Sequence, residues 1–455
     1  MKNWDPNYLP YQPSPKIPSK CRTISPPLVL FWGFSTVILI GALLLMMPFS
    51  YVTPISWNQA IFTAASAVTV TGLVVVDTGS QFTIWGQTII ALLIQIGGLG
   101  FVTFAILAAT SVGAKFNIGR MKVAQEALGQ TSLEQITNIA KFVIIIALVI
   151  EFIGFVLLTL LFLQKQSIGD ATYNAFFYTI SAFNNAGFAL SADSLTAFRG
   201  DAGINLVITS LFIIGGLGFI VLIDIKDNRR WFKFTVNTKV VLLATLIINA
   251  LAFLLFWLIE KNNPATLATL PFSEQLWASW FQAVTPRTAG FNTLPIEQLE
   301  NSSTLLVILL MFIGGGSLST ASGLKLGTFV ILLLATYHFL RQRAQVTIFS
   351  RSVKNKAIFT ALSLFVVYIF LIFAGIFLLT LTEDAPFLDI VFETVSAIGT
   401  VGLSRGLTGT LSIYGQFIII FLMLVGRVGP LSFMYLLATS KRKHVTYAST
   451  SIKVG

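Results

Sequence analysis

The chain has 455 residues, of which 55% are hydrophobic and only 10% are charged. Soluble proteins carry about a quarter charged residues, so this composition excludes an ordinary soluble domain and indicates a membrane protein. The net charge of +11 comes from basic residues between the apolar stretches, a pattern typical of membrane topology and not of a nucleic-acid-binding face.

The N-terminal residues 1–27 are polar and rich in proline, and the apolar run after them is too long for a signal-peptide core. We expect a cytoplasmic tail that leads into a retained first helix. The segments 28–50 and 84–110 are each long enough, as helices, to cross about 30 Å of hydrocarbon. Between them, residues 57–68 are apolar but too short to span, and they end at the sequence TVTGL.

The same order recurs three more times along the chain. Short apolar segments end at NNAGF, RTAGF and GTVGL, and each is followed, at a similar distance, by a second glycine cluster in a long apolar segment. The glycines shared by the four units are Gly72, Gly187, Gly290 and Gly402. We therefore expect an all-α polytopic membrane protein with eight spanning helices, arranged as four pseudo-symmetric helix–pore-helix–filter–helix repeats around one central pore. The expected repeats are residues 28–113, 138–228, 237–343 and 357–440.

Basic residues cluster in the loops that follow every second long apolar segment. By the positive-inside rule we expect these loops on the cytoplasmic side of the cytoplasmic membrane, together with residues 1–27 and a C-terminal tail, 441–455. A site for an acidic partner is the alternative explanation of the basic loops. The opposite side carries mostly acids, among them Asp77, Asp193 and Glu297. An acidic outer face raises the local concentration of cations.

The glycine-containing strands predict a cation selectivity filter. Irregular backbone at membrane depth is tolerated where it is buried or lines a watery cavity. Carbonyl oxygens of such strands can replace the water around a cation, and glycine leaves no side chain in the path. The alternative is a set of packed re-entrant turns with no ion nearby. The expected ion-binding residues are Thr69, Val70, Thr71 and Gly72; Asn185, Ala186 and Gly187; Thr288, Ala289 and Gly290; and Thr400, Val401 and Gly402.

These four units, with TVTGL, NNAGF, TAGFN and GTVGL, resemble the Ktr/Trk/HKT superfamily of potassium transporters, and within it the KtrB-type membrane subunits. The resemblance covers residues 28–440, and its most specific parts are GGGSLSTASGLKLGT at 314–328 and GRVGP at 426–430. It implies four repeats around one pore. Each unit has a single filter glycine, unlike the TVGYG of tetrameric K⁺ channels. Relatives with serine at the first of these glycines tend to favour Na⁺, so Gly72 implies K⁺.

The third inner segment, 302–340, is interrupted by glycines and hydroxyl residues. Each glycine in a helix interior costs about 1 kcal/mol relative to alanine, so an unwound loop at 314–327 is expected just below the filter. The resemblance implies that this loop gates the pore. A nucleotide-binding P-loop is excluded because no Gly-Lys-Ser/Thr follows and both flanks are apolar. The expected gate residues are Gly314, Gly315, Gly316, Ser317, Ser319, Thr320, Ser322, Lys325 and Arg427.

Lys325 and Arg427 stand in otherwise uncharged inner-helix sequence. A base at membrane depth costs at least about 2.5 kcal/mol unless it is paired or hydrated. Arg427 replaces the second glycine of the GGLG found in the first two units, and we expect it to hold the loop by hydrogen bonds while repelling cations. Purely structural anchoring is the alternative role for Arg427, and for Lys325 gating and structural anchoring both stay open.

Four polar residues each have two possible roles, and a fifth has an expected role at the pore mouth. Glu151 fits a buried structural hydrogen bond better than a proton relay, and Glu393 fits a pore-helix brace better than an ion ligand. Asn185 and its neighbour Asn184 could bind the ion or stabilise a turn. We expect Arg287 to anchor the outer mouth.

Function follows from the pore and from the resemblance. We expect a K⁺-conducting subunit that needs no covalent cofactor, with an H⁺- or Na⁺-coupled K⁺ symporter as the alternative. The resemblance implies Na⁺ stimulation, a homodimer and a cytoplasmic nucleotide-binding regulatory ring with RCK domains. One cysteine and two histidines leave no thiol, histidine or metal constellation, so we do not expect an enzyme.

Overall fold

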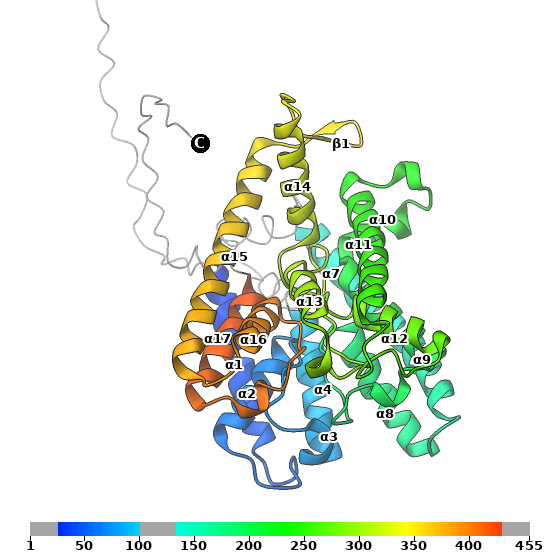
Figure 1. The fold of residues 1–455 in the computed structure, drawn as a ribbon, viewed down its shortest axis with the longest axis vertical. Coiled ribbons are helices and arrows are strands. Elements are labelled where there is room, and N and C mark those ends of the chain that lie inside the picture. The colour runs from blue at the N-terminus through cyan, green and yellow to red at the C-terminus, as the bar shows by residue number, and fades with distance from the viewer. Residues whose placement is uncertain (1–25, 101–132, 430–455) are drawn as a thin grey trace, which may run out of the picture.

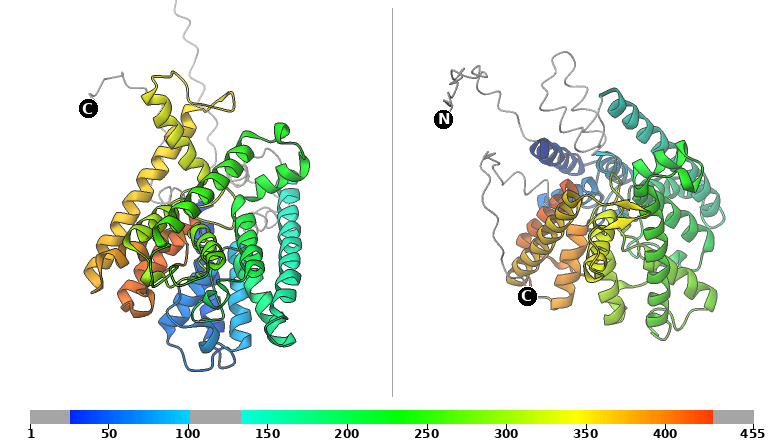
Figure 2. Two further views of the ribbon diagram at one scale, coloured as in Figure 1. Left: turned by 45° about the vertical axis from the view of Figure 1, so that its right-hand side comes forward. Right: turned by 90° about the horizontal axis from the view of Figure 1, so that it is seen from above.

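The computed structural model describes residues 26–100 and 133–429. The expected tails, the end of the first inner segment and residues 430–440 of the last repeat lie outside these ranges. The described part is built of helices, with one two-stranded hairpin, β1 (Thr347–Ile348) and β2 (Arg351–Ser352). The hairpin lies at the tip of the α14–α15 pair, which extends beyond the other helices (Figure 1, Figure 2).

Three groups of helices recur along the chain. The long outer helices are α1 (Pro26–Leu45), α7 (Leu133–Phe162), α11 (Val236–Glu260) and α15 (Asn355–Thr382). The short helices are α2 (Trp57–Val68), α8 (Ile168–Phe183), α12 (Phe272–Val284) and α16 (Phe387–Gly399). The inner helices are α4 (Ile84–Gly98), α9 (Ala202–Leu217), α10 (Phe219–Asp227), α13 (Asn301–Phe312), α14 (Leu326–Leu340) and α17 (Ile413–Val428).

Local sequence explains where the short helices begin. Ser56 caps α2, and Gln59 completes a capping box with it. The helix α8 starts earlier than its apolar segment because the Ser167 hydroxyl accepts a hydrogen bond from the Asp170 N–H. A brief helix, α3 (Thr78–Gln81), and four 3₁₀ turns at 196–198, 231–233, 296–298 and 408–410 complete the described helices.

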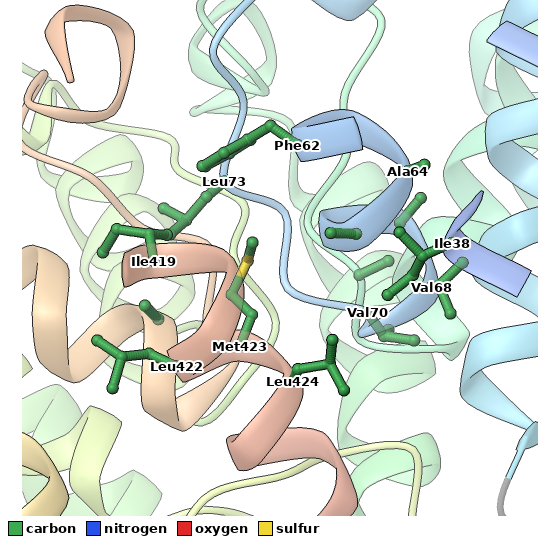
Figure 3. Close-up of a cluster of buried hydrophobic side chains, with 14 of the residues drawn as sticks. Ile38, Phe62, Ala64, Val68, Val70, Leu73, Ile419, Leu422, Met423 and Leu424 are labelled. Carbon is green, nitrogen blue, oxygen red and sulfur yellow. The ribbon is translucent and has the colours of Figure 1, made fainter. Parts of the chain in front are cut away.

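Burial separates the helix groups. The outer helices carry exposed apolar side chains, such as Phe152 (66% exposed) and Phe373 (67%), as expected for surfaces that face lipid. The last two turns of the short helices are buried. In Figure 3, side chains of α2 and the strand after it, such as Val70 and Leu73, lie opposite Ile419 and Met423 of α17. This core joins the first and last units of the chain.

The number of helices that can cross a membrane by length alone is smaller than expected. Within 26–100 and 133–429, only segments 141–162, 236–260 and 355–382 are long and apolar enough by themselves. The inner helices are shorter because the second and third are broken, and because α4 and α17 end at the C-cap residues Leu99 and Gly429.

The apolar stretch at 203–225 predicts one continuous second inner helix, but the structure has two helices there. The break lies at Gly218, where φ is +102°, and α9 and α10 meet at 93°. A bend of this size leaves backbone groups of both helix ends without intrahelical partners.

The segment between α13 and α14, residues 313–325, supplies those partners; we call it the central loop. The Gly216 carbonyl at the end of α9 accepts from the Gly316 N–H at 2.8 Å, and the Phe219 N–H at the start of α10 donates to the Leu318 carbonyl at 2.8 Å. The break in one inner helix therefore depends on the interruption of the next. A continuous helix was predicted because apolar periodicity does not reveal hydrogen bonds from a distant segment.

A single hydrogen bond ties an outer helix to the end of a short helix. Tyr368 of α15 is 1% exposed, and its hydroxyl donates to the Ile398 carbonyl of α16 at 2.9 Å. We expect Tyr368→Phe to lower the free energy of unfolding by about 1 kcal/mol, because the buried carbonyl loses its partner. The measurement is the thermal unfolding midpoint in detergent. Tyr414→Phe is the control, since Tyr414 is 74% exposed. Equal midpoints for the two variants would contradict the assignment.

Candidate functional site

The four strands after the short helices share one backbone pattern. Two residues before each shared glycine, φ is positive at Val70 (56°), Asn185 (61°), Thr288 (74°) and Thr400 (47°). The glycines themselves have φ of 92° (Gly72), 68° (Gly187), 81° (Gly290) and 90° (Gly402). Such alternation lets consecutive carbonyls lie on one side of a strand, whereas ordinary pleated strands point them to alternate sides.

The four glycines form a closed ring. A Cβ built on each glycine falls against a backbone carbonyl oxygen of the next strand, and the fourth glycine meets the first strand. The distances are 2.3 Å (Gly72 to Ala186), 3.0 Å (Gly187 to Ala289), 2.4 Å (Gly290 to Val401) and 2.1 Å (Gly402 to Thr71). All the expected ion-binding residues therefore lie in four strands that meet at one place, and the ring leaves no room for a side chain at its glycines.

The short helices hold the N–H groups of these strands. The residue before the glycine donates backward, from Thr71 to Ser66 at 2.8 Å and from Ala186 to Ser181 at 2.7 Å. The Ser66 hydroxyl also accepts from the Gly72 N–H at 3.0 Å. These N–H groups donate to the short helix that precedes each strand. The strand carbonyls can therefore point to the opposite side, away from that helix.

Sequence reasoning missed the hydroxyl residues at the ends of the short helices, whose hydroxyls form hydrogen bonds at Ser66, Ser181 and Thr285 but not at Ser396. A serine stands six residues before the glycine in the first, second and fourth units, at Ser66, Ser181 and Ser396, and Thr285 stands five before Gly290. The repeated spacing was a signal that could have found them.

A cavity of about 700 Å³ lies on one side of the ring and is lined by all four glycines. Its ionisable lining residues are Asp77, Asp193 and Glu297, and no lysine or arginine lines it within the described residues. Carboxylates around a concave surface with low-dielectric walls attract cations. We call this cavity the vestibule.

Arg405 is the arginine at the vestibule rim. Its Nε pairs with Asp389 at 2.6 Å, and its Nη1 donates to the Thr304 hydroxyl at 2.9 Å. Nearby, Glu393 accepts hydrogen bonds from the hydroxyls of Ser404, at 2.8 Å, and Thr408. This geometry favours the brace over the ion ligand for Glu393.

Arg287 does not lie at the outer mouth, where we expected it. It is 9% exposed, and its guanidinium donates to Asn249 Oδ1 at 3.0 Å and to the Gly314 carbonyl at 3.4 Å, at the start of the central loop. The chain turns back after α12, which takes this side chain away from the vestibule. The position of a turn residue relative to a pore cannot be read from its place in the sequence.

The central loop lies on the other side of the ring. The vestibule is lined by residues that follow the glycines, whereas Thr320 of the loop contacts residues that precede them. The Thr320 hydroxyl is 3.1 Å from the Asn185 side chain and 3.2 Å from the Phe183 carbonyl. The Asn185 side chain also reaches the Thr288 hydroxyl at 3.2 Å, so it joins two strands and the loop.

Arg427 binds the central loop from α17. Its Nη1 donates to the Thr320 carbonyl at 2.5 Å and to the Ser322 hydroxyl at 3.3 Å. Its Nη2 donates to the carbonyls of Gly97, at 2.6 Å, and Gly98, at 3.1 Å, at the end of α4. One guanidinium thus joins the fourth unit, the loop of the third and the inner helix of the first.

Lys325 closes the loop on itself, because its Nζ donates to the Ala321 carbonyl at 2.8 Å. Together with Arg427 it lines a cavity of about 270 Å³ beside the loop. The remaining expected gate residues lie in the same loop; the Ser319 hydroxyl, for example, donates to the Gly316 carbonyl at 2.8 Å. The base-lined cavity and the acid-lined vestibule are on different sides of the ring.

Residues 9–444 match TrkH, a family described as cation transport protein. The chain belongs to the TrkH family. It is 48% identical to the Ktr system potassium uptake protein B of Bacillus subtilis, over 95% of this chain and 97% of that protein. It is 40% identical to the protein of the same name from Vibrio alginolyticus, over 94% of this chain and 95% of that protein. The crystal structure of the potassium transporter TrkH from Vibrio parahaemolyticus matches with a TM-score of 0.74 at 20% identity, over 92% of this chain and 86% of that chain.

Membership in the TrkH family confirms the predicted resemblance. It also confirms that the chain is a membrane transport protein and not an enzyme. The TrkH structure has the same helical architecture, which confirms the predicted all-α membrane fold.

Proposed function

We propose that this chain is the ion-conducting membrane subunit of a K⁺ uptake system. The closed ring of four glycines, between an acidic vestibule and a loop held by an arginine, is the observation that carries the proposal. Two relatives named as Ktr system potassium uptake proteins support K⁺ as the ion.

In this proposal the ring strands are the selectivity filter. Cations gather in the vestibule, and carbonyls of Thr69–Gly72, Asn185–Gly187, Thr288–Gly290 and Thr400–Gly402 replace their water. Glycine at position 72, where Na⁺-favouring relatives tend to carry serine, supports K⁺ over Na⁺.

The central loop and Arg427 are the proposed gate. The loop lies next to the strands on the side away from the vestibule, so it blocks ions when seated and admits them when it swings aside. Its many small residues make a second conformation accessible, with an energy gap of about a few kcal/mol. Arg427 and Lys325 stabilise the seated loop and repel cations.

The wider assembly is part of the same proposal. The chain lies in the cytoplasmic membrane with both termini inside and four repeats at 28–113, 138–228, 237–343 and 357–440. It forms a homodimer, takes its control from a cytoplasmic ring of nucleotide-binding RCK-type subunits and is stimulated by Na⁺. The basic cytoplasmic loops are the surface that such a ring would contact.

Flux in reconstituted vesicles tests the function directly. We expect K⁺ to move only down its electrochemical gradient, because neither the vestibule nor the cavity beside the central loop is lined by a carboxylate of a spanning helix. The measurement is K⁺ tracer uptake with and without a Na⁺ or pH gradient. Uphill K⁺ movement driven by either gradient would favour the symporter, and absence of any K⁺ flux would refute the proposal.

The ring predicts the effect of adding side chains. We expect Gly72→Ser or Gly402→Ser to lower the preference for K⁺ over Na⁺ at least about tenfold, since a Cβ at either position displaces a carbonyl of the neighbouring strand. Competition by Na⁺ in the flux assay measures this. Gly169→Ser is the control, because a Cβ there meets nothing within 4 Å. Wild-type selectivity in both ring variants would show that the ring is not the filter.

The gate predicts a gain of flux. We expect deletion of residues 315–322 to raise K⁺ flux and reduce its dependence on cytoplasmic regulators while selectivity is largely kept. Arg427→Ala should shift flux the same way but less, because the loop keeps its backbone bonds to α9 and α10. A folded deletion variant with wild-type, fully regulated flux would mean that the loop only fills space.

A further inference from the structure

Three side chains from three different elements form a closed polar triangle beside the second strand of the ring. Glu151 of α7 accepts hydrogen bonds from Gln95 of α4 at 3.0 Å and from Asn184 at 3.1 Å, one on each carboxylate oxygen. Asn184 also donates to the Gln95 side-chain oxygen at 2.7 Å. The triangle therefore fixes both amides relative to one carboxylate.

The carboxylate is in an unusual position for a charge. Glu151 is 7% exposed, lies in the middle of an apolar helix and forms no ion pair among the described residues. Burying a carboxylate without a cation is costly, and two amides compensate this only in part. An ionisable residue buried in a spanning helix usually has a function other than stabilising the fold.

Asn184 connects the triangle to the ring. It is the C-cap of α8, and the next residue, Asn185, begins the second strand with a positive φ. On its other side, a Cβ built on Gly98 would lie 1.9 Å from Asn184 Oδ1. Asn184 is thus held between Glu151 and the end of α4, directly before the strand that begins at Asn185.

The same end of α4 also meets the gate. The carbonyls of Gly97 and Gly98, which accept from Arg427, follow Gln95 by two and three residues. Glu151 itself lines neither the vestibule nor the cavity beside the central loop. It is therefore placed to act on the ring through Asn184 and not by touching an ion.

We propose that Glu151 is a positioning residue that sets the second strand of the filter through Asn184. The role rests on the proposed function, since it concerns how well the ring binds K⁺. The Glu151 carboxyl accepts a hydrogen bond from each of the two amides, and these hydrogen bonds define the carbonyl positions of Asn185 and Ala186.

The test compares half-saturating K⁺ concentration, maximal flux and K⁺/Na⁺ preference in vesicles. We expect Glu151→Ala to raise the half-saturating K⁺ concentration about tenfold and to weaken K⁺ preference, the size expected for the loss of a buried hydrogen bond. Maximal flux per folded molecule should stay unchanged. Glu151→Gln should give a smaller change, because its side-chain oxygen still accepts one amide hydrogen bond.

Two further variants make the result specific. Gly98→Ala pushes on Asn184 from the opposite side and should weaken K⁺ affinity in the same way without touching Glu151. Glu260→Gln is the control, because Glu260 is also buried but accepts hydrogen bonds from Asn263 and Thr266 at the end of α11. It should keep wild-type affinity and selectivity.

Each other outcome overturns the proposal. Wild-type affinity and selectivity in folded Glu151→Ala, or in both Glu151→Gln and Gly98→Ala if the alanine variant does not fold, would leave Glu151 with a purely structural role. Loss of all flux in Glu151→Gln with wild-type affinity in Gly98→Ala would make it a proton-carrying group. A wild-type protein without K⁺ flux would refute the proposed function and this role with it.

Discussion

The contact between each ring glycine and the carbonyl of the next strand is the constraint on which the rest of the structure depends. It requires four chain segments, far apart in sequence, to approach at backbone distance inside a membrane protein. The buried short helices hold these strands, because their carbonyls accept from N–H groups just before the glycines, such as those of Thr71, Ala186 and Val401. The long outer helices then give the short ones a surface to pack on and present apolar side chains outward.

The two broken inner helices illustrate the same rule. A helix end buried without partners is costly, so a break persists only where something else satisfies its polar groups. Here the central loop satisfies the break at Gly218, and Arg427 satisfies carbonyls at the end of α4 as well as in the loop. The seated loop is consequently tied to the first, second and fourth units at once, which explains how a flexible, glycine-rich segment can have one defined conformation.

Much of this could be predicted from the sequence because the same signals occur four times. The recurrence of a short apolar segment followed by glycine located the ring residues, and the uncharged surroundings of Arg427 pointed to its contact with the loop. Other contacts between segments distant in the chain could not be predicted. Three features depend on which polar group a remote residue offers: the bend at Gly218, the inward position of Arg287 and the bonds of Arg405 to Asp389 and Thr304. Apolar periodicity contains no such information.

Arg427 has no equivalent in the sequence of the other three units, and this has a consequence for how the proposed pore can change. In a pore assembled from four identical chains, any substitution appears four times, and four guanidinium groups around one axis would repel each other as well as the ion. A pore folded from a single polypeptide is free of that restriction. One unit can carry a charge, the next can carry a loop, and a third can carry a hydrogen-bonded triangle of side chains. Each of these features can be altered by mutation independently of the others.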